Sequence, residues 1–246
     1  MASSRFPGKP MAKILNMPMI GHCYSRSKLS SSLDEVYVAT CDNEIYDYIE
    51  SIGGKAVMTA DTHERASDRA AEALLNIEAE CGEKYDIVVM IQGDEPMLTP
   101  EMLDSAIESL LNDPKVLVSN LMAELKTKEE HEDPNEVKVV IDKFNNALYF
   151  SREPIPSRQK GVDNPRMLKQ VCLIPFKRDF LIEYTNMEPT PLEITESVDM
   201  MRILENGLKV RMVPTSSNTY AVDTEKDLSH VEELMKNDPL LKEYIK

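Results

Sequence analysis

The segment YDIVVMIQGDEP, residues 85–96, most constrains the fold, because it joins an apolar strand to an abrupt acidic end. Its apolar run shows no polar alternation, which is typical of a strand inside a parallel sheet covered by helices on both faces. After the Gly-Asp-Glu-Pro end, we expect a helix with Thr99 as its N-cap and Pro100 as its first residue. A buried strand that ends in carboxylates and leads into a helix indicates an α/β fold with polar chemistry at one sheet edge.

The preceding residues repeat the alternation of strand and helix. We expect strands in DEVYVATCD (34–42) and AVMTA (56–60), and helices over residues 43–52 and 66–82. Alternating strands and helices are typical of a doubly wound α/β sheet, in which ligands bind beyond the carboxyl ends of the strands.

The pattern changes in the middle of the chain. Residues 135–156 predict two strands around an Asn-Asn turn, and the charged stretch before them, residues 124–136, predicts a solvated surface loop. Residues 167–176 predict one further strand, and residues 190–207 predict one helix that ends at a glycine.

We therefore expect a single domain over residues 1–246, with an insertion over about residues 122–190 where the pattern changes.

Composition narrows the class of partner. The chain carries a formal net charge of -15, and such a surface repels polyanions, so we expect no nucleic-acid partner. No apolar run approaches the roughly 18 residues that span a membrane, and no secretory signal is recognisable, so we expect a cytoplasmic protein. The four cysteines form no C-x-x-C pair and are expected to be free thiols.

Three short segments carry groups that a magnesium–nucleotide complex requires. SSRFPGK offers Arg5 and Lys9 around a turn in which Gly8 lets backbone N–H groups approach phosphate. Asp94 and Asp223 each follow an expected strand, and carboxylate oxygens are ligands that Mg²⁺ prefers. Each signal is weak by itself, since an aspartate after a strand is more often a helix cap.

Several stretches in one order give the chain a resemblance to a known family. The chain resembles the 3-deoxy-manno-octulosonate cytidylyltransferase (CMP-Kdo synthetase) family in SSRFPGKPM, IQGDEPM, DPNEVKVVID, ALYFSREPIP, PTPLE and VDTEKDL. The resemblance runs from residue 2 to about residue 235. Its most specific part is the combination of QGDEP with ALYFSR.

This resemblance implies a Rossmann-like nucleotidyltransferase sheet with helices on both faces and a β-hairpin insertion through which a homodimer forms. It also implies CTP, Mg²⁺ and an acidic sugar as partners. In the implied reaction the anomeric hydroxyl of the sugar attacks the α-phosphate of CTP, and pyrophosphate leaves. Catalysis of this kind is mainly positioning and charge neutralisation.

The resemblance also implies roles for individual residues. Catalysis would fall to Arg5, Lys9 and Asp94, and Mg²⁺ would be held by Asp94 and Asp223. The residues implied to bind the nucleotide are Arg5, Lys9, Ser67, Arg69 and Gln92. Those implied to bind the sugar acid are Lys138, Ser151, Arg152, Gln170 and Glu196.

The chain departs from the family pattern at its start. The family begins with a strand of the form V-I-I-P-A-R before the Pro-Gly-Lys loop, and this sequence starts after it. The first strand of the family therefore lies outside the sequence. A start codon placed too late, a trimmed chain and a real deletion that weakens the enzyme are all open explanations.

A second departure concerns the sugar. Gln170, Ile174 and Met200 stand where the family has His, Tyr and Gln, which are expected to meet sugar hydroxyls. Loss of hydrogen bonds to hydroxyls changes substrate choice, so the acceptor is either the usual octulosonate or a related 2-keto-3-deoxy acid. A transferase that uses another nucleotide and a non-enzymatic nucleotide-binding relative stay open as alternatives.

Overall fold

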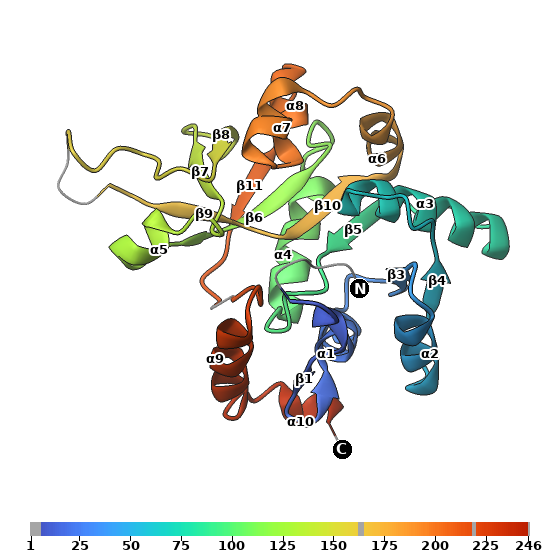
Figure 1. Ribbon diagram of the computed structural model, residues 1–246. Coiled ribbons are helices and arrows are strands. Elements are labelled where there is room, and N and C mark those ends of the chain that lie inside the picture. Colours follow the sequence, from blue (N-terminus) through green and yellow to red (C-terminus); the bar gives the residue numbers. More distant parts are fainter. Residues whose placement is uncertain (1–5, 162–164, 218–219, 246) are drawn as a thin grey trace. The chain divides into compact units, whose positions relative to one another are not determined.

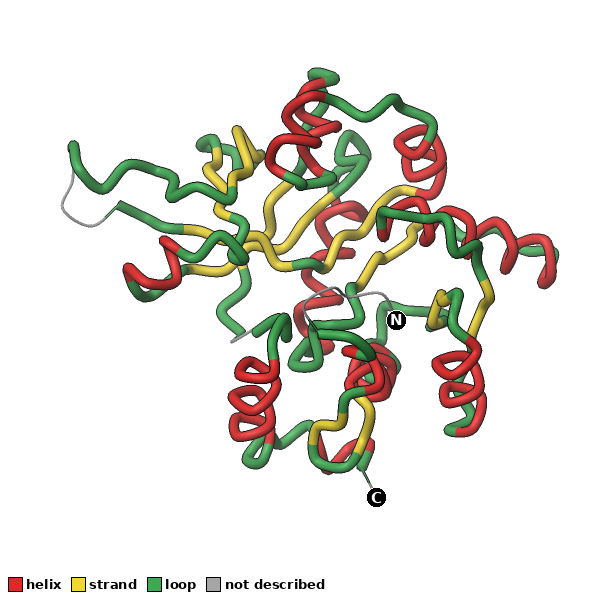
Figure 2. The backbone as a smooth tube through the Cα atoms, in the orientation of Figure 1, coloured by secondary structure: helices red, strands yellow, loops and turns green. Residues whose placement is uncertain are grey.

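The computed structural model describes residues 6–161, 165–217 and 220–245, and its fold divides into two compact units (Figure 1). The first unit comprises Met1–Lys84, Ile91–Asp104 and Asn218–Lys246, and the second comprises Tyr85–Met90 and Ser105–Ser217. The expected insertion, about residues 122–190, falls within the second unit. Helices and strands occur throughout both units (Figure 2). In the described ranges, no helix has the length and apolar character needed to cross a membrane.

The first unit contains most of the helices and strands expected before residue 85. Its elements are the 3₁₀ helix η1 (Lys9–Met11), strands β1 (Lys13–Ile14), β2 (Met17–Pro18), β3 (Val38–Thr40) and β4 (Ala56–Met58), and helices α1 (Met19–Ser27), α2 (Asn43–Ser51), α3 (Ala66–Cys81), α9 (Glu225–Met235) and α10 (Leu241–Tyr244). Strands β3 and β4, which precede and follow α2 in the sequence, pair in parallel, as the alternation predicts. Gly53, with φ 72°, follows the end of α2 in a left-handed conformation that favours glycine.

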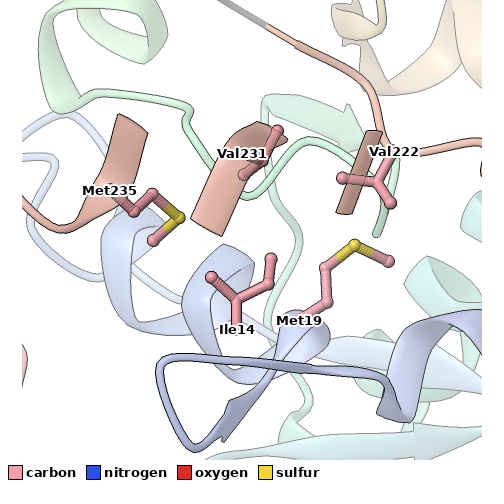
Figure 3. Packing of buried hydrophobic residues seen from close by; sticks show 5 residues of the cluster. All are labelled: Ile14, Met19, Val222, Val231 and Met235. Atoms are coloured by element: carbon pink, nitrogen blue, oxygen red, sulfur yellow. The ribbon is translucent and has the colours of Figure 1, made fainter. Parts of the chain in front are cut away.

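One hydrophobic cluster joins distant parts of the first unit. Ile14, Met19, Val222, Val231 and Met235 are completely buried, and their side chains point toward one another (Figure 3). Val231 and Met235 lie four residues apart on one face of α9, the spacing of an amphipathic helix. Burial of each such side chain contributes about 1.5–3 kcal/mol. The cluster therefore anchors α9, and the segment just before it, against β1 and α1.

The second unit is built on a mixed sheet. Its strand order is β11 (Arg211–Pro214), β6 (Ser119–Glu124), β9 (Leu168–Val171), β7 (Lys138–Ile141) and β8 (Ala147–Ser151). Strands β11 and β6 are parallel, and the other neighbouring pairs are antiparallel. The sheet of this unit is therefore mixed, whereas the alternation before residue 85 predicted parallel strands.

The expected hairpin is confirmed in strands β7 and β8. Asp142 stabilises the turn between them, because its Oδ1 accepts hydrogen bonds from the backbone N–H groups of Phe144 and Asn146, both at 2.8 Å. Asn145, with φ 60°, takes the left-handed conformation that asparagine tolerates well. A role of this hairpin in dimerisation stays a prediction.

One expected strand is interrupted, and one expected helix begins without its side-chain cap. The strand predicted over residues 167–176 is split at Cys172, and its second half, β10 (Leu173–Lys177), pairs with β5 (Ile87–Ile91). Helix α4 (Pro100–Asn112) begins at the expected residue. The Thr99 carbonyl accepts from Met102 N–H at 3.1 Å, but its buried hydroxyl makes no hydrogen bond with any described residue. Thr99 thus precedes the helix as predicted, without a side-chain cap.

The single helix predicted over residues 190–207 is wrong. The structure has α7 (Pro191–Glu196) and α8 (Met200–Glu205), separated at Ser197 with φ 52°. The Arg202 guanidinium forms two hydrogen bonds to the Glu193 carboxylate, at 2.6 and 2.7 Å, and both side chains are buried. In one continuous helix these residues, nine apart, would face about 180° away from each other. The break at Ser197 permits their pairing.

The surface loop predicted over residues 124–136 is also partly wrong. It contains the short helix α5 (Lys128–Glu132), which begins with a capping box between Thr127 and Glu130. The T-x-x-E spacing is visible in the sequence and is a known helix start. The second unit also contains helix α6 (Arg178–Thr185), which follows β10.

Candidate active site

The structure brings Lys9, Asp94 and Asp223 together in the first unit. Lys9 Nζ donates to Asp94 Oδ2 at 2.7 Å and lies 3.3 Å from Asp223 Oδ1. Lys9 follows Gly8, whose φ of 72° reverses the chain at the start of η1. The sequence predicted this grouping from three segments, and 214 positions separate Lys9 from Asp223. The predicted roles of the three residues stay predictions, which the geometry supports.

Main-chain contacts fix the distance between the two carboxylates. The N–H of Val222 donates to the carbonyl of Asp94 at 3.0 Å, so the loop after β5 is tied to the residue before Asp223. Asp227 Oδ2 accepts from the N–H of Asp223 at 3.1 Å and from the N–H of Thr224 at 2.8 Å. Asp223 is thereby held at the start of α9, where Thr224 and Asp227 form a capping box.

The charges of this site balance only in part. Burial lowers the pKa of Lys9, but the adjacent Asp94 and Asp223 carboxylates outweigh burial and raise it above its usual value. Lys9 is therefore an ammonium at neutral pH. One ammonium between two carboxylates leaves a net negative charge, which favours a further cation.

The donor set fits a magnesium ion. Asp94 Oδ1 is buried and makes no hydrogen bond with any residue that the structure describes. A buried acceptor without a partner costs free energy, and a nearby cation would offset that cost. The described residues contain no group of three or more His, Cys, Asp and Glu side chains able to hold a metal. A magnesium ion at Asp94 and Asp223 would thus take its other ligands from phosphate and water, as this ion commonly does.

Three other residues expected to bind the nucleotide, Ser67, Arg69 and Gln92, lie in the same unit. The fourth, Arg5, lies outside the described residues. Ser67 is completely buried in the first turn of α3, and Arg69 Nη1 donates to Thr59 Oγ1 at 2.5 Å and to the carbonyl of Ala60 at 3.1 Å. The carbonyl of Gln92 accepts from Glu95 N–H at 3.3 Å and closes the turn that carries Asp94.

A second group of charged side chains lies in the second unit, around Glu196. Its carboxylate accepts hydrogen bonds from the Tyr149 hydroxyl at 3.0 Å, the Ser151 hydroxyl at 3.0 Å and the Arg152 N–H at 2.9 Å. The Arg152 guanidinium also donates to the carbonyls of Glu196, Pro134 and Ser197. We call Tyr149, Ser151, Arg152 and Glu196 the Glu196 cluster. It unites three of the five residues expected to bind sugar.

The structure argues against Lys138 as a sugar ligand. Lys138 is completely buried, and Nζ donates to the carbonyls of Asp133 at 2.8 Å, Glu136 at 2.6 Å and Arg152. Three bonds use all three donors of an ammonium. Burial lowers the pKa of Lys138, with the nearby carboxylates opposing that shift. Its contacts suit a structural role that ties the hairpin to the preceding loop.

The remaining positions of the sugar half are engaged in packing. Gln170 Nε2 donates to Asn120 Oδ1 at 2.5 Å. Ile174 is 2% exposed and Met200 is completely buried, so both belong to the core of the second unit. Packing alone therefore accounts for apolar side chains at these two positions.

One buried polar group was missed in the sequence. Arg26 on α1 is completely buried and binds the Asp238 carboxylate, the Tyr244 hydroxyl at 3.0 Å and the carbonyl of Leu98 at 3.3 Å. Leu98 follows the loop that carries Asp94, so Arg26 connects this loop to the C-terminal residues. The only sequence signal was an arginine within an otherwise largely apolar helix, MIGHCYSRS.

The fold, with a lysine held between two carboxylates, indicates an enzyme of the nucleotidyltransferase class. The chain belongs to the cytidylyltransferase family, whose model, described as "Cytidylyltransferase", matches residues 1–211.

Named relatives agree with this assignment. The chain is 41% identical to 3-deoxy-manno-octulosonate cytidylyltransferase of Geobacter metallireducens, over 94% of this chain and 93% of the relative. It is 42% identical to the protein of the same name from Pelobacter propionicus, over 92% of this chain and 91% of the relative.

Solved structures show the same fold. CMP:2-keto-3-deoxy-manno-octonic acid synthetase complexed with CTP superposes with a TM-score of 0.86 and 34% identity, covering 96% of this chain and 94% of that chain. The 4-diphosphocytidyl-2C-methyl-D-erythritol synthase of Anaerococcus prevotii, at 12% identity and a TM-score of 0.59, covers 93% of each chain and shows the fold alone. The expected α/β nucleotidyltransferase fold is thus confirmed. The apparent absence of the family's first strand stays a prediction.

Proposed function

We propose that this protein transfers CMP from CTP to 3-deoxy-manno-octulosonate and releases pyrophosphate. The observation that carries the proposal is the Lys9–Asp94–Asp223 site, found in a chain of the cytidylyltransferase family. Two further facts support it: relatives about 41% identical bear the name of this activity, and a related structure contains CTP.

The residues of the first unit would bind the triphosphate. Asp94 and Asp223 would hold Mg²⁺, which supplies positive charge to the phosphate oxygens when it is bound. Lys9 is an ammonium with three donors on a flexible stem, so it can bind a phosphate oxygen directly. Arg5 would add a second cation, and Ser67, Arg69 and Gln92 would contact the nucleoside. Such fixed charges act on the pentavalent phosphorus without reorganising during the reaction.

Residues of the second unit would bind the sugar acid. Within the Glu196 cluster, Arg152 is best suited to the sugar carboxylate, because its guanidinium has five donors and the three bonds described above use three of them. Ser151, Glu196 and Gln170 would contact hydroxyl groups, and Lys138 would act only through the backbone that it holds.

We also propose that the protein is a cytoplasmic homodimer. Phe144 in the β7–β8 turn and Leu148 on β8 are 63% and 61% exposed. Two large apolar side chains on one exposed hairpin suit a subunit interface.

The function is tested by a pyrophosphate-release assay. CTP, UTP, ATP and GTP are each combined with 3-deoxy-manno-octulosonate and with other 2-keto-3-deoxy sugar acids, using this chain and a version extended upstream by one strand. We expect release with CTP and 3-deoxy-manno-octulosonate. Release with UTP and not with CTP would assign another nucleotide, and release only with another acid would assign another acceptor. No release from any pair would identify a non-enzymatic nucleotide-binding relative.

A further inference from the structure

We propose that the Lys9 ammonium occupies the place of the metal in the nucleotide-free protein, so that a divalent ion enters only together with the triphosphate. The inference rests on the proposed function, because it takes a nucleoside triphosphate as the substrate. It concerns the order in which the two cations and the nucleotide meet.

The geometry places one cation between the two carboxylates. Nζ of Lys9 contacts both Asp94 Oδ2 and Asp223 Oδ1, at 2.7 and 3.3 Å. An ion that bridges the same two carboxylates would lie close to this ammonium. The side chain of Lys9 is 12% exposed, so the ammonium is poorly screened by water.

The Lys9 ammonium and a divalent ion cannot both lie between the Asp94 and Asp223 carboxylates unless further negative charge is added. The two carboxylates balance either one divalent ion or one ammonium with charge left over, and an added ammonium would repel a bound divalent ion. A triphosphate changes this balance, because its oxygens accept from the ammonium. Lys9 has a flexible four-carbon stem and can turn from the carboxylates to the phosphates.

Asp94 Oδ1 shows why the metal is still favoured once Lys9 leaves. This oxygen is buried and makes no hydrogen bond with any described residue, while Oδ2 holds the lysine. A divalent ion would satisfy the Asp94 carboxylate more completely than one ammonium does. The lysine therefore offsets half of the carboxylate charge in the nucleotide-free protein, and the nucleotide releases it.

The test measures binding of Mn²⁺ alone, without nucleotide, by electron paramagnetic resonance of the free ion. Wild-type protein is compared with Lys9→Met, which keeps the apolar stem and removes the charge. We expect Lys9→Met to bind one Mn²⁺ at least ~10-fold more tightly than wild type, about 1.4 kcal/mol. Adding Asp94→Asn to Lys9→Met should abolish that gain.

Two further variants keep the test decisive. Lys28→Met removes an equal charge from an exposed position on the same unit and should bind Mn²⁺ as wild type does. Lys9→Gln replaces Lys9→Met if circular dichroism shows that the methionine variant is not folded. Equal Mn²⁺ affinity of wild type and the Lys9 variants would overturn the inference, as would an equal gain in Lys28→Met.

Failure of this inference differs from failure of the proposed function. The pyrophosphate assay uses Mg²⁺ and no Lys9 variant, and the Mn²⁺ measurement uses no nucleotide. Activity with CTP but no gain in Lys9→Met would reject the lysine exchange alone. A gain in Lys9→Met without activity toward CTP would retain the exchange and reject the transferase.

Discussion

The Lys9–Asp94–Asp223 site of the first unit and the Glu196 cluster of the second are both rich in charge, but their hydrogen bonds differ. Asp94 keeps one buried oxygen without a hydrogen bond to any described residue. Glu196, in contrast, accepts on both carboxylate oxygens. The nearby Lys138 uses all three donors on backbone carbonyls.

The difference separates residues that await a ligand from residues that hold the fold. A buried carboxylate oxygen without a donor is costly and is retained where a ligand later satisfies it. Lys138, whose donors are all used, stabilises its surroundings and has little to offer a ligand, whereas Glu196 keeps an acceptor site for a sugar hydroxyl. Substitutions in the first site should therefore affect activity, and substitutions of bonded groups in the second unit should affect stability.

The largest effect is expected for Asp94→Asn. The change keeps the shape of the side chain and removes the charge proposed to hold Mg²⁺, so kcat should fall by roughly 10²–10³-fold. The loss of the partly exposed contact with Lys9 should change the free energy of unfolding by no more than about 1 kcal/mol. Steady-state kinetics and urea unfolding measure both effects.

Asp34→Asn, at an exposed position of the same unit, is the control and should leave both quantities unchanged. If the kcat of Asp94→Asn stayed within a few-fold of wild type, Asp94 would not be a metal ligand. The proposed contrast between the two regions would then fail.

The next effect concerns the buried pair in the second unit. Arg202→Met removes the guanidinium that pairs with the buried Glu193 carboxylate, and breaking a buried ion pair costs about 3–5 kcal/mol. Arg166→Met is the matched control, because Arg166 bonds Glu124 at 2.9 Å where both side chains are exposed, and exposed pairs contribute about 0–1 kcal/mol. Urea unfolding should separate the two variants clearly. If both variants lost the same free energy of unfolding, the buried Arg202–Glu193 pair would stabilise the fold no more than the exposed Arg166–Glu124 pair does.

A smaller loss of stability is expected for Lys138→Met. Three carbonyls of half-buried residues lose their donor, which should lower the free energy of unfolding by about 2 kcal/mol after the gain from removing a buried charge. The KM for the sugar acid should stay at the wild-type value. Lys115→Met, at an exposed position of the same unit, should change neither quantity. A raised KM at unchanged stability would return Lys138 to the sugar-binding residues.

The smallest effect depends on pH and on a structural histidine of the first unit. His22 is buried between the Tyr244 hydroxyl and the carbonyl of Ile14, and its pKa is lowered chiefly by burial, with Arg26 contributing and the Ile14 hydrogen bond opposing. Below the unfolded value of about 6.5, the unfolded chain binds more protons than the folded one, so stability falls as pH falls.

Between pH 7.5 and 5.5, wild type should lose more stability than His22→Gln does, by at most about 1.4 kcal/mol per pH unit. Urea unfolding at the two pH values measures the difference. An equal loss in both proteins would show that His22 is not held neutral. A confirmed difference would show that the first unit also contains bonded structural groups.

Much of the fold was predictable because local patterns dominate it. Strands β3, β4 and β5 and helices α2, α3 and α4 follow from apolar runs and helix boundaries. The meeting of Lys9, Asp94 and Asp223 was predicted from strand ends and from the family resemblance, and the strand expected before Asp223 is wrong, because residues 220–223 form no strand. The break at Ser197 was missed because a non-glycine residue adopts the left-handed conformation there, and only the Arg202–Glu193 pair explains it.

Contacts between distant positions that no family motif marks could not be predicted. Arg26 and Asp238 are 212 positions apart, and no periodicity connects a helix near the start of the chain with a turn near its end. Lys138 illustrates the same limit: its charge suggested a ligand for an acid, whereas its burial and the three carbonyls around it became visible only in the folded chain.

The hydrogen bond from Val222 to the Asp94 carbonyl belongs to the main chain, so exchanging side chains cannot delete it. Only proline at position 222, which lacks an N–H, would remove it directly. Most substitutions of nearby side chains should therefore leave the distance between Asp94 and Asp223 unchanged. Side chains that line the site can then change during evolution, and with them the acceptor, while the spacing of the two aspartates is kept.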